Sequence, residues 1–139
     1  MRFWDSSALV SLCVEESFTS RAGAYYQEDP QLGVWWASPV ECASAFARSR
    51  REGTIELAEE EEARAVLAAL SERWHEVQPS ETVRKNALRL LRLHALSTGD
   101  ALQLAAAMTW AGTPAEGELV TFDARLADAA RLEGFKVLL

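Results

Sequence analysis

Short apolar runs alternate with amphipathic segments along the whole chain. The apolar runs are bounded by glycine, proline or acidic residues, as buried strands are. They predict strands at residues 2–5, 32–37, 117–123 and 135–139, with a short strand or loop at residues 75–80. Because strands that alternate with helices usually pair in parallel, we expect an α/β fold with a mostly parallel sheet and helices on both faces.

Helical periodicity fills the segments between these strands. It predicts helices at residues 6–14, 18–27, 38–53, 55–74, 81–95, 99–110 and 124–134. The third helix has the clearest boundary signals. Ser38 is expected to be its N-cap, with Pro39 at the first helical position and Glu41 completing a capping box. Gly53 is expected to end it.

The last two helices also carry start and stop signals. Ser97 is expected to cap the helix at residues 99–110, and Gly112 and Pro114 are expected to stop it. Gly134 is expected to close the final helix before the last strand. No internal repeat or linker interrupts this order, so the chain is expected to be one domain over residues 1–139.

The composition is that of an ordinary globular protein, with 49% hydrophobic and 25% charged residues among 139. No apolar run approaches the roughly 20 residues of a membrane helix, and the N-terminus lacks a basic leader. A cytoplasmic location is therefore expected. Cys13 and Cys42 are far apart and lack metal-ligand spacing, so they indicate neither a disulfide framework nor a zinc site.

The formal net charge of −7 argues against a protein whose whole surface binds nucleic acid. It is compatible with a local basic groove, or with an acidic pocket that needs metal ions before it meets a phosphate. The acidic run at residues 59–62 is interpreted as a solvated helix face, in which Glu60 can pair with Arg64 one turn later.

Four acids occupy similar places in this pattern. Asp5, Glu41 and Asp123 each lie where a predicted strand has ended and a helix begins, and Asp100 also lies at a helix start. Acids in a first helical turn are often caps that meet the positive end of the helix dipole. In a parallel sheet, however, the carboxyl ends of the strands lie along one edge, where such folds bind ligands. The four acids are therefore expected to converge.

Converging carboxylates repel one another unless some are protonated or cations neutralise them. Hard oxygen ligands suit Mg²⁺ or Mn²⁺, which leave coordination positions open for phosphate oxygens. A metal held in this way can activate water and stabilise the leaving oxygen of a phosphodiester. The pattern of acids therefore predicts metal-dependent phosphodiester hydrolysis.

The order of four motifs along the chain resembles the PIN-domain nucleases, in particular bacterial toxins of the VapC type. The motifs are DSSALV, SPVE at the head of a helix, GDALQLAAA, and TFDARLADAARLEG. The resemblance implies a Rossmann-like α/β/α sandwich and RNA hydrolysis that depends on Mg²⁺ or Mn²⁺, with products carrying a 5′-phosphate and a 3′-hydroxyl. It also implies a homodimer and inhibition by a cognate VapB-type antitoxin.

Site residues are carried over from the resemblance by motif. It implies that Asp5, Glu41 and Asp100 hold the principal metal, that Asp123 helps or holds a second ion, and that one of the four accepts a proton from water. Ser6 and Thr121 become supporting hydroxyls near the first and last carboxylates. Two positions depart from the family pattern: Ser11 stands where a basic residue is common, and Gly99 where an apolar or basic one is.

Two basic clusters could guide RNA towards the acidic site through phosphate contacts that do not read sequence. Arg48 and Arg51 lie one turn apart on the helix that carries Glu41. The other cluster occupies one face of a later helix and consists of Lys85, Arg89 and Arg92. Solvated helix faces that balance neighbouring acids are an equally good interpretation of both clusters.

Two other classes of function stay open at this point. A phosphotransferase or phosphatase could use Asp5 as a strand-end nucleophile, although enzymes of that type usually carry a second aspartate two residues later, where this chain has Ser7. A non-catalytic dimeric interaction module could use the acids only as helix caps. Metal binding separates the interaction module from the nuclease, because a carboxylate cluster should bind Mn²⁺ and scattered caps should not.

Overall fold

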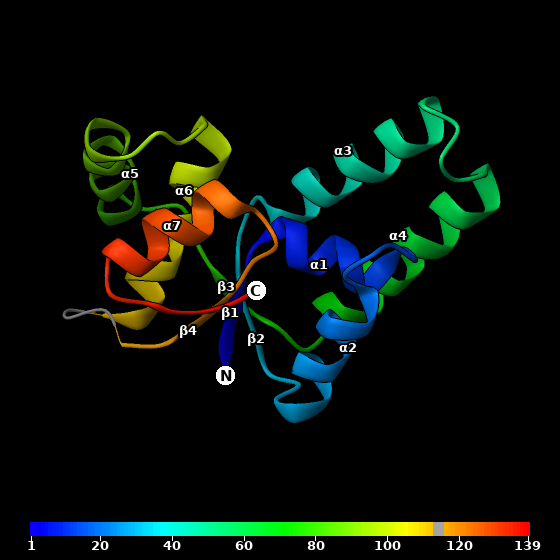
Figure 1. The fold of residues 1–139 in the computed structure, drawn as a ribbon, viewed down its shortest axis with the longest axis horizontal. Coiled ribbons are helices and arrows are strands. Elements are labelled where there is room, and N and C mark those ends of the chain that lie inside the picture. The colour runs from blue at the N-terminus through cyan, green and yellow to red at the C-terminus, as the bar shows by residue number, and fades with distance from the viewer. Residues whose placement is uncertain (113–115) are drawn as a thin grey trace.

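The computed structural model describes residues 1–112 and 116–139, and within them a five-stranded parallel sheet lies between two layers of helices (Figure 1). The strand order is β3-β2-β1-β4-β5, and every neighbouring pair is parallel. The strands are β1 (Arg2–Trp4), β2 (Leu32–Trp35), β3 (His75–Val77), β4 (Glu118–Val120) and β5 (Lys136–Leu138). The predicted α/β/α fold class is confirmed.

Each predicted helix is present, with ends within a few residues of the expected ones. The helices are α1 (Ser6–Cys13), α2 (Thr19–Glu28), α3 (Ser38–Arg51), α4 (Leu57–Ser71), α5 (Glu81–Leu93), α6 (Thr98–Ala111) and α7 (Ala124–Leu132). Helices α1 to α4 lie on one side of the sheet and α5 to α7 on the other (Figure 1). No helix in the described part of the chain is both long and apolar enough to cross a membrane.

Alternation along the strands divides the core into two halves. In β1, Phe3 belongs to the cluster formed with α5, α6 and α7, whereas Trp4 belongs to the cluster formed with α1 to α4. In β4, Leu119 and Val120 divide in the same way. Successive side chains of a strand point to opposite faces, so three-residue strands suffice to hold both helical layers against the sheet.

The sheet extends in both directions from β1. The strands β2 and β3 are added on one side of β1, and the later strands β4 and β5 are added on the other side. The connections after β1 and β2 cover one face, and those after β3 and β4 cover the other. The carboxyl ends of β1 and β4 therefore flank a topological switch point, which is where doubly wound sheets bind their ligands.

The predicted start of α3 is wrong in its capping. Ala37, which has helical angles of φ −86° and ψ −1°, is the N-cap, and it makes no side-chain cap hydrogen bond. Ser38 is already inside the helix, and its buried hydroxyl instead accepts a hydrogen bond from Gln103 of α6. Glu41 forms no capping box, because its carboxylate also bonds to other elements. Tertiary contacts have replaced the local cap.

The acidic run in α4 is not uniformly solvated as predicted. Glu60 is only 7% exposed, because α3 packs over the start of α4. Its carboxylate lies 3.8 Å from Arg64, the predicted partner, and 3.6 Å from Arg50 of α3. The helix itself begins with a reciprocal capping box between Glu56 and Glu59.

The start and stop signals of α6 agree with the structure in the residues that it describes. Ser97 accepts a hydrogen bond from the backbone N–H of Asp100, as predicted, and Gly112 follows the helix with a φ of 82°. A left-handed φ of this size favours glycine over any residue with a Cβ. The predicted stop at Pro114 lies outside the described residues.

We expect Gly117→Ala to destabilise the fold by about 1–3 kcal/mol, because the added methyl group overpacks the core. A Cβ at Gly117 would stand 2.8 Å from the ring of Trp110. Gly23→Ala in α2 is the matched control, since a Cβ there meets no atom of the described residues within 4 Å. That control should stabilise the protein by about 0.5–1 kcal/mol. Chemical denaturation measures both, and equal stability of the two variants would contradict the packing argument.

Candidate active site

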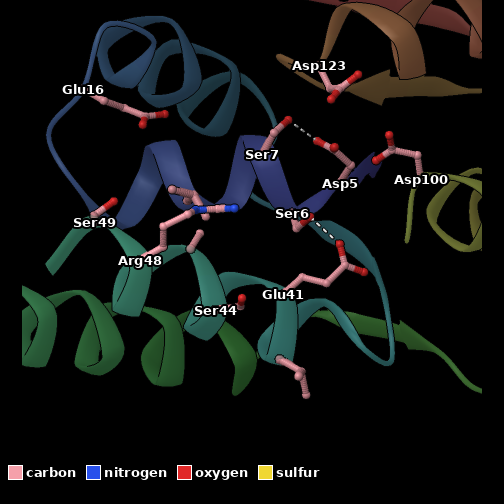
Figure 2. Close-up of a pocket in the computed structure, with 13 residues that line it drawn as sticks. Asp5, Ser6, Ser7, Glu16, Glu41, Ser44, Arg48, Ser49, Asp100 and Asp123 are labelled. Atoms are coloured by element: carbon pink, nitrogen blue, oxygen red, sulfur yellow. Dashed lines mark hydrogen bonds between the residues drawn. The ribbon is translucent and has the colours of Figure 1, made fainter. Parts of the chain in front are cut away.

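A pocket of about 640 Å³ opens at the carboxyl edge of the sheet, between α1, α3 and the starts of α6 and α7. All four predicted carboxylates line it, each from a different segment of the chain (Figure 2). The full lining is Asp5, Ser6, Ser7, Val10, Glu16, Val40, Glu41, Ser44, Ala45, Arg48, Ser49, Asp100 and Asp123. The parallel topology has thus brought together acids that lie up to 118 positions apart in the sequence.

Asp5 is the most buried of the four acids, with 2% of its surface exposed. Its Oδ1 accepts hydrogen bonds from the backbone N–H of Ala8 at 3.2 Å and from the hydroxyl of Ser7 at 2.7 Å. Burial raises the pKa of the Asp5 carboxyl to about 7, although these hydrogen bonds oppose the shift. In the absence of a cation, folded Asp5 therefore stays protonated up to a much higher pH than an exposed aspartate.

Asp123 has a similar local arrangement at the start of α7. Its Oδ1 accepts from the backbone N–H of Leu126 at 2.9 Å, and its own N–H donates to the hydroxyl of Thr121 at 3.1 Å. Asp123 therefore caps α7 as Asp5 caps α1. In both aspartates the hydrogen bonds recorded among the described residues end on Oδ1. Capping thus occupies one oxygen, and Oδ2 is available to a ligand.

Glu41 is held from two sides. The hydroxyl of Ser6 donates to its Oε2 at 2.8 Å, and the amide nitrogen of Gln103 donates to its Oε1 at 3.3 Å. Burial raises the pKa of Glu41, the two hydrogen bonds lower it, and the charge of Asp100 raises it further. Ser6 therefore supports Glu41, whereas the resemblance placed it beside Asp5.

Asp100 lies in the first turn of α6, with its backbone N–H capped by Ser97 at 3.2 Å. Partial burial raises the pKa of its carboxyl, and the nearby charge of Asp123 adds to the rise, against an opposing effect of Arg125. Glu41, Asp100 and Asp123 are thus linked by mutual repulsion along the pocket. A cation placed among them would offset the repulsion between their negative charges.

The donor chemistry of the pocket fits a hard divalent cation. It offers carboxylate oxygens and hydroxyls, including the second oxygen of the buried Asp5, and no soft sulfur or imidazole ligand is among its lining residues. Within residues 1–112 and 116–139, no three His, Cys, Asp or Glu side chains already stand at ligand distances from one point. The acids therefore line one pocket without forming a closed metal cage.

The remaining predicted site residues have different surroundings. Thr121 is buried beneath the pocket, where it contacts the Ser7 hydroxyl and accepts from the N–H of Asp123. Of the predicted basic residues, Arg48 lines the pocket, on the α3 side and away from the four acids (Figure 2). Four others are exposed and do not line it; Arg89 pairs with Glu133 at 3.1 Å. These four are Arg51, Lys85, Arg89 and Arg92.

Two residues missed at the sequence level hold the carboxylates in place. Ser7 donates to Asp5 and accepts from the backbone N–H of Phe122 at 2.9 Å, so it joins the ends of β1 and β4. Its position two residues after Asp5 was the available signal. For Gln103, the only feature in the sequence that indicated a role at the site was an amide side chain within an apolar helix.

The two departures from the family pattern also have structural explanations. Ser11 is buried in α1 and donates to Glu16, so Glu16 rather than Ser11 lines this end of the pocket. Gly99 lies against Glu41, since a Cβ there would stand 3.8 Å from Oε2 of that residue. Glycine therefore leaves this side of the Glu41 carboxylate open.

Comparison with known proteins agrees with this geometry. A sequence profile of the PIN domain matches residues 2–132, so the chain belongs to the PIN-domain family and the predicted family is confirmed. A comparison with curated proteins finds no match to the chain.

Solved structures with the same fold share little sequence with this chain. A toxin–antitoxin complex from Klebsiella pneumoniae has 17% identity and a TM-score of 0.61, over 90% of this chain and 88% of that one. PAE2754 from Pyrobaculum aerophilum has 18% identity and a TM-score of 0.66, over 94% and 79%. VapC20 of Mycobacterium tuberculosis, described as a toxin that cleaves the sarcin-ricin loop, has 18% identity and a TM-score of 0.67, over 98% and 97%.

The raised pKa of Asp5 predicts that the metal-free protein loses stability as the pH rises. An aspartate in the unfolded chain titrates near pH 3.9, whereas folded Asp5 titrates at about 7. Stability from this group is thus fully present below about pH 4 and is lost as the pH rises through 7. Once Asp5 is fully ionised, the free energy of unfolding has fallen by an amount on the order of 4 kcal/mol.

Asp5→Asn should flatten this pH dependence, because asparagine can still cap α1 but does not ionise. Asp128→Asn is the control, since Asp128 is an exposed acid on α7. Thermal unfolding in EDTA between pH 4 and 8 measures the effect. Parallel profiles for the wild type and Asp5→Asn would show that Asp5 is ionised throughout.

Proposed function

We propose that this protein is a metal-dependent endoribonuclease that hydrolyses RNA phosphodiester bonds with Mg²⁺ or Mn²⁺. We further propose that residues 1–139 act as one nuclease domain. The observation that supports this best is the convergence of Asp5, Glu41, Asp100 and Asp123 on one pocket at the switch point of a PIN-domain sheet. Helix capping explains the positions of two of these acids but not the convergence of all four.

The four carboxylates would hold the metal. When bound, a divalent ion supplies an activated water and charge stabilisation at the scissile phosphate. Asp5, Glu41 and Asp100 would bind the principal ion, and Asp123 would assist or hold a second one. Ser7 and Ser6 orient two of these groups through their hydroxyls. The pKa of Asp5, raised to about 7 by burial, suits a carboxyl that exchanges a proton with water at neutral pH.

The groove between α1 and α3 is proposed as a phosphate path that leads away from the four carboxylates, with Glu16 at its far end. Arg48 lines this part of the pocket beside the hydroxyls of Ser44 and Ser49 (Figure 2). Among the described residues Arg48 lies within 4.0 Å of no carboxylate, so its charge is available to a phosphate. Arg51, Lys85, Arg89 and Arg92 would contribute at most a weaker, distant attraction.

The protein is proposed to be the toxin of a toxin–antitoxin pair, inhibited by a cognate VapB-type antitoxin. The fold shared with a Klebsiella pneumoniae toxin–antitoxin complex supports this proposal. An acidic pocket with a single arginine in its lining favours a basic partner segment. Such a segment could neutralise the carboxylates in place of a metal ion.

A homodimer is proposed through an apolar groove between α5, α6 and the end of β2. The groove has a volume of about 540 Å³ and includes Trp36, which is 51% exposed, and Leu88, which is 59% exposed. Leu91, which is 42% exposed, also lines this groove. Exposed large apolar side chains around one groove are typical of protein interfaces.

The decisive test of the nuclease proposal is cleavage of labelled single-stranded RNAs with Mn²⁺, with Mg²⁺ and with EDTA. We expect cutting only with metal, and a loss of about 100-fold or more in Asp100→Asn, because the variant keeps the shape of the side chain but loses its charge. Asp128→Asn is the matched control, with the same change on an exposed part of α7. If the wild type is inert and binds no Mn²⁺, the acids are only caps and the interaction-module function replaces the nuclease.

The dimer proposal predicts that Leu88→Glu separates the protomers. An unpaired carboxylate buried in an apolar interface should raise the dimer dissociation constant about 100-fold. Leu132→Glu is the control, because Leu132 is 78% exposed on α7 and outside the groove. Analytical ultracentrifugation over a concentration series distinguishes the two. A monomeric wild type, or equal association of both variants, would contradict this interface.

A further inference from the structure

Gln103 is a buried amide in an otherwise apolar stretch of α6. It is 1% exposed and is surrounded in sequence by Ala101, Leu104, Ala105 and other fully buried residues. Its side-chain oxygen has no hydrogen-bond partner among the described residues. Burying an amide with one group unpaired costs free energy that a leucine or methionine at this position would not cost. Packing therefore does not account for a glutamine here.

The amide nitrogen of Gln103 reaches two groups of α3. It donates to the hydroxyl of Ser38 at 3.0 Å and to Oε1 of Glu41 at 3.3 Å. An ionised carboxylate only accepts hydrogen bonds, so the nitrogen rather than the oxygen of the amide must face Glu41. Both amide hydrogens are thus used, and both contacts fall in the first turn of α3.

The spacing along the two helices places this link directly beneath the acids. Gln103 follows Asp100 by three residues on α6, and Ser38 precedes Glu41 by three residues on α3. Residues three apart lie on the same side of a helix, one turn from each other. The hydrogen bond between Gln103 and Ser38 therefore joins the two helices one turn from the point where Asp100 and Glu41 face the pocket.

Glu41 is the only glutamate among the four acids, and its side chain has one more rotatable bond than an aspartate, so its orientation needs support. Ser6 binds Oε2 and Gln103 binds Oε1, and each bond comes from a different helix. With both oxygens held, the carboxylate loses less conformational entropy when it binds an ion. Neither of these hydrogen bonds is made by another of the four carboxylates.

We propose that Gln103 is a positioning residue that orients Glu41 for metal binding and sets the spacing between Glu41 and Asp100. This inference rests on the proposed metal-dependent function of the same pocket. Gln103 acts through Glu41 and does not touch the ion or the RNA. The unpaired amide oxygen is the energetic cost of placing a donor at this point in the core.

Gln103→Met tests this role, because methionine is also unbranched and of similar length but donates no hydrogen bond. We expect the affinity for Mn²⁺ to fall about 10-fold, the typical effect of losing a group that orients a metal ligand. The melting temperature in EDTA should change little, because the variant removes the unpaired oxygen but also removes the donor to the buried Ser38 hydroxyl. Calorimetric titration of metal-free protein with Mn²⁺ gives the affinity independently of activity.

Two further variants separate positioning from packing. Leu104→Met changes a fully buried neighbour on the same helix, and it should alter stability while leaving the Mn²⁺ affinity unchanged. Gln103→Asn keeps the amide but shortens the side chain by one methylene, so it should lose affinity as Gln103→Met does. It also tests the proposal if the methionine variant does not fold.

The outcomes separate this inference from the proposed function. If the wild type binds Mn²⁺ and cuts RNA while both Gln103 variants keep its Mn²⁺ affinity, Gln103 is structural and only the positioning role is overturned. If the wild type binds no Mn²⁺, the proposed function fails and the positioning role fails with it. Reduced affinity in both Gln103 variants, with Leu104→Met unchanged, supports the role.

Discussion

The burial of the Asp5 carboxylate at the end of the central strand is the constraint on which the rest of the site depends. β1 is paired on both sides, with β2 and β4, and the N–H of Asp5 still bonds to the carbonyl of Val120 at 3.2 Å. The side chain is therefore fixed where it is removed from water. Its charge can be stabilised there only by local donors or by a cation, and otherwise the carboxyl takes up a proton. The other three acids line the same pocket because the elements that carry them meet at the same edge of the sheet.

The fold was predictable from the sequence because its signals are short-range and repeated. Most strands are brief apolar runs, most helices have a polar face, and the alternation of strands and helices admits few topologies. Local caps such as Ser97 before Asp100 were also predictable, since the two groups involved are three residues apart. The placement of the four carboxylates around one pocket followed from parallel topology rather than from any contact visible in the sequence.

The features that could not be predicted all depend on contacts between distant segments. Ser38 has the sequence signals of a cap, but α6 provides a donor 65 residues away that binds its hydroxyl. Glu60 belongs to an acidic run that looks solvated, yet α3 covers it and supplies Arg50. Ser7 joins two strand ends that are 115 residues apart. In each case the side chain has the expected local chemistry, and the tertiary structure decides which partner it meets.

The two carboxylate oxygens of Asp5, and likewise those of Asp123, have different roles, and this difference has an evolutionary consequence. In each residue Oδ1 caps a helix while the side chain lines the pocket, so under the proposed function folding and chemistry depend on different oxygens of one carboxylate. Replacing a single oxygen by an amide nitrogen preserves the first function and removes the second. A lineage under selection against the activity could therefore silence it in one step and still produce an intact fold. Inert copies of such a chain would persist as well-folded proteins rather than as unstable remnants.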